Sequence, residues 1–368
     1  MKQRIVFLDF VRVFACFLVI LVHACENYYA SAAPGELAGP VTWLDNETDH
    51  LWVSLYDGFS RMAVPLFIIV SAYLLVPMSK NVTMGTFYRK RFTRILPPAL
   101  LFMVLYAVLP LAWGGTDAAR ATSDFFSIPL NFPELAGHLW FLYPLISIYL
   151  FTPMISPWLY QATKRQEQFF IALFAVSTLM PYLNHWFGYV WGECFWNQYH
   201  LLWYFSGYLG YVVAAHYIRV HLSWSRSKRV AVGLPMLLIG AAATIWSFYA
   251  QTTVQALIPT PEAELGWSFC TINVLVLTLG AFLLFSCIEL KTTPAPVLQL
   301  SRLSYSMYLM HIFWLLLVVS IIKEDMNLAS PVAIPLIAVV TFCLCWATAR
   351  LLSFLPCSLW LGIEKPKK

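Results

Sequence analysis

Residues 6–25 read VFLDFVRVFACFLVILVHAC, an apolar run whose strongly polar members are Asp9, Arg12 and His23. An α-helix of about 20 residues is about 30 Å long, which matches the hydrocarbon thickness of a bilayer. The basic segment before the run could begin a signal peptide. The charges inside the run and the lack of a clean cleavage site argue against cleavage. We therefore expect a retained first transmembrane helix.

Runs of the same kind recur along the chain. Of its 368 residues, 60% are apolar and 11% are charged, whereas soluble domains have about 25% charged residues. The further runs lie at 54–76, 93–113, 138–157, 169–186, 199–217, 230–250, 267–288, 303–322 and 331–355. They do not alternate as the strands of a membrane barrel would. The sequence thus predicts an all-α fold, a polytopic membrane bundle of about ten transmembrane helices.

This composition also limits the function. We expect a single integral membrane domain over residues 1–368, with no appended soluble domain. A soluble enzyme, a disordered chain and a DNA-binding domain are excluded by the apolar content. The formal net charge of +5 therefore does not indicate a nucleic-acid partner. The partner that the composition does imply is the lipid bilayer.

The basic residues predict the orientation of the bundle. If the N-terminus is cytoplasmic, most of the 23 Lys and Arg residues fall in cytoplasmic segments, and the opposite loops keep only Arg120 and Lys323. Cytoplasmic loops of membrane proteins are enriched in Lys and Arg. We therefore expect both termini in the cytoplasm, residues 80–94 and 219–229 on the same side, and residues 26–53 on the outer side.

None of the eight cysteines belongs to a CxxC pair, and most lie inside apolar runs. There they are expected to be small core residues rather than ligands or redox centres. Cys25 and Cys194 both fall near the outer face, so a disulfide between them is left open. No spacing typical of zinc ligands occurs, and no metal is expected.

Ionisable residues inside the first span are candidates for function, because each costs about 2.5–3.5 kcal/mol on insertion scales. Arg12 and His23 are eleven positions apart. That spacing is three helical turns plus about 20°, so the two side chains share one face about 16 Å apart. Asp9 lies one turn before Arg12 and is expected to neutralise it. The alternative is a snorkelling arginine and an interfacial histidine.

Arginines also mark the second and third spans. Arg61 lies inside the second span, upstream of Ser71, where it requires a carboxylate, a water-filled cavity or an anionic ligand. A purely structural pair with Asp57, one turn earlier, remains open. Arg91 and Arg94 lie one turn apart at the entrance of the third span and could bind a phosphate. Ordinary positive-inside charge is the alternative.

The ninth span contains Ser304, Tyr308 and His311 at positions i, i+4 and i+7. This spacing forms one polar stripe on an apolar helix. We expect the stripe to line a cavity, with His311 near the middle of the membrane and deeper than His23. A histidine buried alone in a core is the alternative.

Six motifs in order along the chain carry a family resemblance. They are LDFVR (8–12) followed by His23, RMAVPLF (61–67) with SAYLL (71–75), RFTRILP (91–97), HLWFL (138–142), YFSGY (204–208) and SYSMYLMH (304–311). In this order they resemble the membrane-bound acyltransferase-3 family. The chain departs from the family at Val13 and Ala72, where glycine is usual.

The resemblance implies transfer of an acyl group, usually acetyl, from a cytoplasmic acyl-CoA to a glycan or lipid-linked saccharide. The short ten-span form without an appended domain resembles O-acetyltransferases of cell-surface polysaccharides in the bacterial inner membrane, whereas some relatives use succinyl groups or acylate antibiotics. Acetyl-CoA, or another acyl-CoA, would then be a co-substrate, and no cofactor would be bound permanently.

Acyl transfer to a hydroxyl needs a base, a stabiliser of the developing oxyanion and an anion site for CoA. His23 is the expected base, because a histidine pKa lies near working pH. Arg12 and Arg61 complete the catalytic set, and Arg91 and Arg94 are expected to bind the donor. The residues expected to line the cavity and orient substrate are Asp9, Ser71, Trp140, Ser304, Tyr308 and His311.

A secondary transporter is the alternative function, since ionisable residues inside the membrane also serve proton-coupled carriers. That class is typically built from two related halves with paired discontinuous helices. The sequence shows no such internal symmetry, and its charged residues cluster in the first three spans. The acyltransferase interpretation is therefore favoured.

Overall fold

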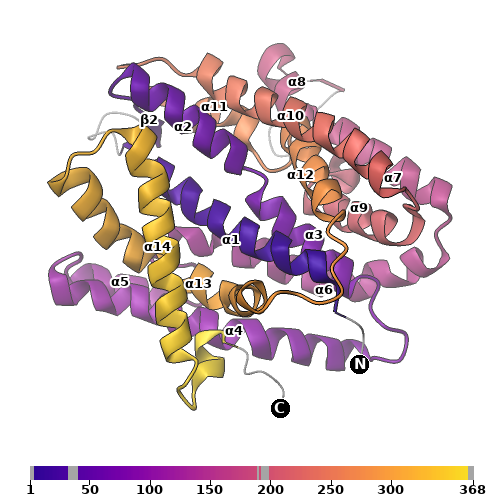
Figure 1. Cartoon of the computed structure of the whole chain (residues 1–368), viewed down its shortest axis with the longest axis horizontal. Coiled ribbons are helices and arrows are strands. Elements are labelled where there is room, and N and C mark those ends of the chain that lie inside the picture. The colour runs from indigo at the N-terminus through magenta and orange to yellow at the C-terminus, as the bar shows by residue number, and fades with distance from the viewer. Residues whose placement is uncertain (1–3, 32–39, 189, 192–198, 364–368) are drawn as a thin grey trace.

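The computed structural model describes residues 4–31, 40–188, 190–191 and 199–363. Within this part the chain is a helical bundle with three very short strands (Figure 1). The α-helices are α1 (Val6–Glu26), α2 (Glu47–Ser60), α3 (Ala63–Leu75), α4 (Met84–Val108), α5 (Ala118–Ser127), α6 (Leu142–Gln161), α7 (Lys164–Ser177), α8 (Met180–Phe187), α9 (Tyr208–His221), α10 (Arg226–Gln251), α11 (Thr260–Ala263), α12 (Ile272–Phe285), α13 (Ala295–Val319) and α14 (Ser330–Leu352). Short 3₁₀ or π segments are η1 (Leu109–Trp113), η2 (Glu134–Phe141), η3 (His200–Phe205), η4 (Leu265–Trp267), η5 (Ser320–Asp325) and η6 (Ser358–Leu361).

Nine helical segments of the described chain are long and apolar enough to cross a membrane. Each of them coincides with one of the predicted runs, and several consist of two consecutive helices, such as α2 and α3 over Glu47–Leu75. The prediction of an all-α polytopic membrane bundle is therefore confirmed. The orientation of the bundle in the membrane stays a prediction.

The predicted run at 199–217 differs from the others because it is broken. Gly207 separates η3 from α9 with φ 71°, a left-handed conformation that ends the regular helix. The remaining helix, α9, has 14 residues and packs beside α3 and α7. Near its end, the Arg219 guanidinium donates to the carbonyls of Tyr73 and Val76, both at 2.5 Å. The ends of α9 and α3 therefore lie together.

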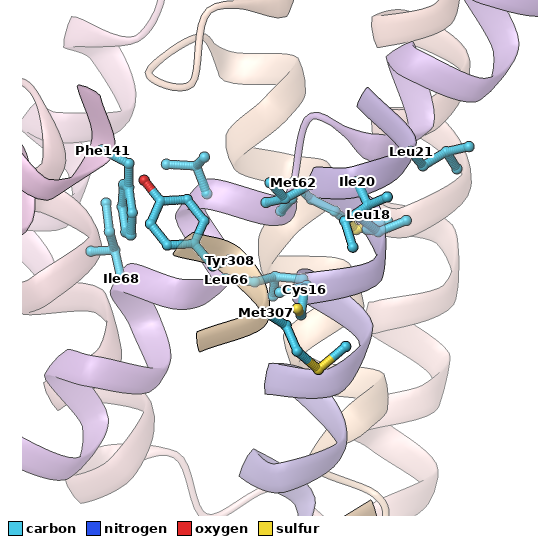
Figure 2. Packing of buried hydrophobic residues seen from close by; sticks show 14 of the residues in the cluster. Cys16, Leu18, Ile20, Leu21, Met62, Leu66, Ile68, Phe141, Met307 and Tyr308 are labelled. Atoms are coloured by element: carbon cyan, nitrogen blue, oxygen red, sulfur yellow. The ribbon is translucent and has the colours of Figure 1, made fainter. Parts of the chain in front are cut away.

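Helix α1 runs through the middle of the bundle and packs against α2, α3, α13 and α14 (Figure 1). Figure 2 shows its Cys16, Leu18 and Ile20 in the same buried apolar cluster as Leu66 of α3 and Met307 of α13. Lipid tails are as apolar as these side chains, so close packing rather than exclusion of water determines where α1 lies. The central helix thus provides a fixed frame for its polar residues.

Small residues allow α10 and α12 to approach each other closely. A Cβ added at Gly240 would lie 2.4 Å from the backbone nitrogen of Leu277, and one at Gly280 would lie 2.4 Å from that of Leu237. Such contacts are too short for any side chain, so both positions require glycine. Small residues at helix contacts are typical of membrane bundles.

A three-stranded antiparallel sheet lies just beyond the end of α1 that carries His23. Its strands are β1 (Ala30–Ser31), β2 (Val41–Thr42) and β3 (Ile258–Pro259), in the order β1-β2-β3. Val41 lies opposite Ser31 on one side and Pro259 on the other. The sheet therefore joins the chain that follows α1 to the chain between α10 and α11.

Candidate active site

Three histidines from distant parts of the sequence meet in the interior of the bundle. His23 is in the last turn of α1, His138 is in η2, and His311 is in α13. The His311 ring centroid lies 5.1 Å from that of His23 and 4.7 Å from that of His138. The His23 and His138 centroids are 6.3 Å apart. We call these three residues the histidine cluster.

His23 is oriented by a carboxylate that the sequence interpretation missed. Its Nδ1 lies 2.6 Å from Oε2 of Glu26, which is one helical turn further on. An ionised carboxylate only accepts hydrogen bonds, so Nδ1 carries the proton and Nε2 keeps its lone pair. The His23 side chain is 15% exposed. The pair is thus a base with a defined tautomer, and the His-x-x-Glu spacing was the signal that could have revealed it.

The other two histidines are fully enclosed. His311 donates from Nδ1 to the carbonyl of Tyr308 at 2.6 Å, and its Nε2 is buried without a partner among the described residues. Both ring nitrogens of His138 are likewise buried without a hydrogen bond of good geometry. His311 therefore lies against His23 rather than at a separate, deeper level. Sequence reasoning used His138 only as part of a motif and missed it as a site residue.

Arg61 is held in a buried ion-pair network, close enough to His23 to interact with it electrostatically. Its guanidinium donates to both carboxylate oxygens of Asp57, at 2.6 and 2.9 Å, and to the Tyr29 hydroxyl at 3.1 Å. Glu264 lies at 3.5 Å, and the guanidinium lies 4.3 Å from the centroid of the Trp267 ring. Burial raises the pKa of the Tyr29 phenol well above its usual range, so it remains a donor to Glu264. The pair with Asp57 that the sequence left open is thus present, and the catalytic role of Arg61 stays a prediction.

Asp9 interacts electrostatically with Arg12, as the spacing predicted, but the hydrogen bonds that it accepts come from other residues. Both of its oxygens accept from Arg4 at 2.6 Å, and they also accept from the hydroxyls of Ser301 at 2.6 Å and Thr293 at 2.8 Å. These bonds tie the start of α1 to the start of α13. Arg4 at i−5 and two hydroxyls distant in sequence therefore supply hydrogen bonds to Asp9, while Arg12 at i+3 interacts with it electrostatically.

Arg12 also belongs to a cluster of three arginines. Arg12 of α1 and Arg91 and Arg94 of α4 all lie near enough to Tyr149 of α6 to interact with it electrostatically, and Ser71 shares a hydrogen bond with the same phenol. The Nε atom of Arg91 is buried and makes no hydrogen bond within the described residues. Three neighbouring cations repel one another, so the arrangement favours a multivalent anion. We call Arg12, Arg91 and Arg94 the arginine cluster.

The remaining predicted site residues make contacts within the protein. The hydroxyl of Ser304 donates to the Ser301 carbonyl at 3.1 Å, and that of Tyr308 donates to the His138 carbonyl at 2.7 Å. The Trp140 ring stacks on Phe269 with 5.4 Å between centroids. Tyr308 therefore supports the histidine cluster through the backbone.

Two sequence expectations concern metal and disulfide chemistry. In the part of the chain that the structure describes, no group of three His, Cys, Asp or Glu side chains is arranged to hold a metal ion. Cys25 is buried, and Cys194 lies outside the described residues.

Comparison with known proteins gave one family match. A family model described as an acyltransferase domain matches residues 5–350. Searches of curated proteins and of solved structures gave no match. The matched range contains both the histidine cluster and the arginine cluster.

Proposed function

Since the chain belongs to the acyltransferase-3 family, whose members transfer an acyl group to a hydroxyl acceptor, we propose that its donor is a cytoplasmic acyl-CoA, with acetyl-CoA the simplest. The acceptor is a hydroxyl of a cell-surface glycan or a lipid-linked saccharide. The protein acts in the bacterial inner membrane, where a cytoplasmic donor and an outer acceptor meet across one bilayer. Acyl-CoA enters as a co-substrate.

The observation that carries the proposal is the His23–Glu26 pair beside two further histidines. In the reaction, Nε2 of His23 takes the proton from the acceptor hydroxyl while its oxygen attacks the thioester carbon. The carbon–sulfur bond then breaks, and the CoA sulfur takes the proton back from the His23 imidazolium. Glu26 stabilises the imidazolium in between. An ester and free CoA are the products, and no further reactant is needed.

The arginine cluster supports a CoA donor. Arginine binds phosphate groups through parallel N–H donors, and CoA is rich in phosphate. Arg12 and His23 lie on one face of α1 about 16 Å apart, because eleven residues of helix separate them. With the phosphates on the arginine cluster, the flexible arm of CoA would run along this face and carry the thioester to His23.

The proposal is tested with purified protein and radiolabelled acetyl-CoA. We expect label on saccharide extracted from membranes, and slow release of free CoA when water is the only acceptor. A His23→Ala variant, which keeps the arginine cluster, should bind donor without releasing CoA. A protein that moves a solute into proteoliposomes but neither acylates saccharide nor cleaves acetyl-CoA would contradict the proposal and favour a transporter.

A further inference from the structure

The imidazole of His138 is buried, and neither of its ring nitrogens makes a hydrogen bond of good geometry within the described residues, although the Leu309 carbonyl lies close to the ring. The side chain is surrounded by rings, with the Tyr106 centroid at 5.1 Å and the Tyr308 centroid at 5.7 Å. Leaving a buried donor without a good hydrogen bond destabilises a protein, and most buried polar groups in proteins are paired. An imidazole kept in this state implies a partner that arrives with the substrate.

The tautomers of the three histidines indicate whether this partner donates or accepts a hydrogen bond. A neutral imidazole carries one N–H, and in His23 and His311 that N–H is already given to Glu26 and to the Tyr308 carbonyl. Within the histidine cluster, His138 is therefore the residue whose N–H makes no hydrogen bond of good geometry, with the Leu309 carbonyl as its nearby acceptor. Its ring lies 6.3 Å from that of His23 between centroids. At this separation the two rings are in edge-to-face contact, so a small group that contacts one ring lies beside the other.

We propose that His138 is a catalytic residue whose ring N–H donates a hydrogen bond to the carbonyl oxygen of the acyl group. The inference rests on the proposed acyl transfer. When the acceptor oxygen attacks the thioester carbon, the carbonyl electron pair moves onto that oxygen, and the His138 N–H stabilises the resulting charge. The pair returns when the carbon–sulfur bond breaks, and the proton of His138 is never transferred.

The structure holds His138 ready for this role. The Tyr308 hydroxyl fixes the backbone carbonyl of His138 at 2.7 Å, and the Tyr106 hydroxyl, on the neighbouring ring, is fixed to the Leu309 carbonyl at 3.0 Å. The His138 residue is 5% exposed, so little water competes for the N–H of its ring. A donor that is already oriented before the reaction needs no reorganisation as charge develops.

The test compares His138→Leu, which removes the donor, with His138→Gln, which keeps an N–H. The control is His185→Leu, at an exposed histidine of α8. Turnover, the KM for acetyl-CoA and the pH dependence of turnover are measured on protein shown to be folded by its melting temperature. We expect His138→Leu to lower kcat by about 100–1,000-fold. The donor KM should change less than about threefold, and the pH dependence set by His23 should persist.

We expect His138→Gln to recover part of the lost turnover and His185→Leu to match the wild type. A folded leucine variant with wild-type kcat overturns the inference, as does one that loses the pH dependence, because His138 would then be a base. If wild type cleaves acetyl-CoA and His23→Ala does not, the proposed function stands whichever result His138 gives.

A second measurement does not depend on the stability of the leucine variant. In His23→Ala protein, which cannot turn over, the infrared C=O stretch of bound ¹³C-acetyl-CoA should lie below its value in water-free solvent. The double variant His23→Ala/His138→Gln should give a different frequency. An unshifted carbonyl in the His23→Ala protein overturns the inference.

Discussion

Replacing Glu26 tests whether the His23–Glu26 pair works as a unit. The 2.6 Å contact between Nδ1 and Oε2 is a charge-assisted hydrogen bond whenever His23 has accepted a proton. Glu26→Gln keeps the side-chain volume and a hydrogen-bonding group but removes the negative charge. The imidazolium that forms during transfer then loses its counter-ion, whereas binding of the donor at the arginine cluster is untouched.

The magnitude follows from the exposure of the carboxylate. Hydrogen bonds to charged groups contribute about 1.5–3 kcal/mol. The Glu26 side chain is 39% exposed, so water screens the charge and the lower end of this range applies. About 1.5 kcal/mol corresponds to roughly a tenfold loss of kcat. The donor KM should stay within about twofold of wild type.

A matched control is available in the same protein. Glu47 and His50 form another i,i+3 pair, with 3.6 Å between the carboxylate and Nδ1, at the start of α2. Glu47→Gln should leave release of CoA from acetyl-CoA unchanged. The reasoning fails if a folded Glu26→Gln protein turns over as fast as wild type, or if its defect is entirely in KM.

Three further predictions concern other parts of the bundle. Arg91→Ala or Arg94→Ala should raise the donor KM by about 10–150-fold, and lysine at either position should recover part of the loss. Arg89→Ala should leave the donor KM unchanged. If the donor KM is the same in all three alanine variants, Arg91 and Arg94 serve membrane topology alone. Asp9→Asn should lower the melting temperature, because it weakens the hydrogen bonds that Asp9 of α1 accepts from Ser301 and Thr293. The donor KM of the folded fraction should stay unchanged. A variant with the melting temperature of wild type would count against this anchoring role of Asp9. In a cysteine-free variant, a cysteine at position 47 should react with an impermeant reagent from the outer side, and labelling from the cytoplasmic side would reverse the orientation.

Local periodicity made the fold and part of the site predictable. Apolar runs long enough to cross a membrane predicted the positions of the long helices. The helical repeat predicted that Arg12 and His23 share one face of α1. The break at Gly207 was harder to foresee, because the flanking residues are as apolar as those of a continuous span. A single residue with positive φ ends a helix without changing the composition around it.

Pairings between distant residues were not predictable in the same way. Asp9 had a nearby candidate in Arg12, yet its hydroxyl partner Ser301 lies 292 positions away. The pair of Arg61 with Asp57, at i and i+4, could be predicted from the sequence, but the contact of Arg61 with Glu264 could not. The histidine cluster combines three segments whose spacing follows no local repeat. Such contacts depend on how the helices pack, and no single-helix pattern contains that information.

The way α1 and α13 are joined bears on the choice of donor. Asp9 bonds to Ser301 near the start of both helices, and the rings of His23 and His311 meet further along both, 5.1 Å apart. The rise of α1 places Arg12 about 16 Å from His23 along the helix axis, and the two ties hold α13 in register with α1. In the proposed reaction, a CoA held by its phosphates on the arginine cluster presents its thioester at the level of His23. We then expect the extra carbons of a longer acyl group to meet the rings around His138, so that the packing of those rings limits the acyl length.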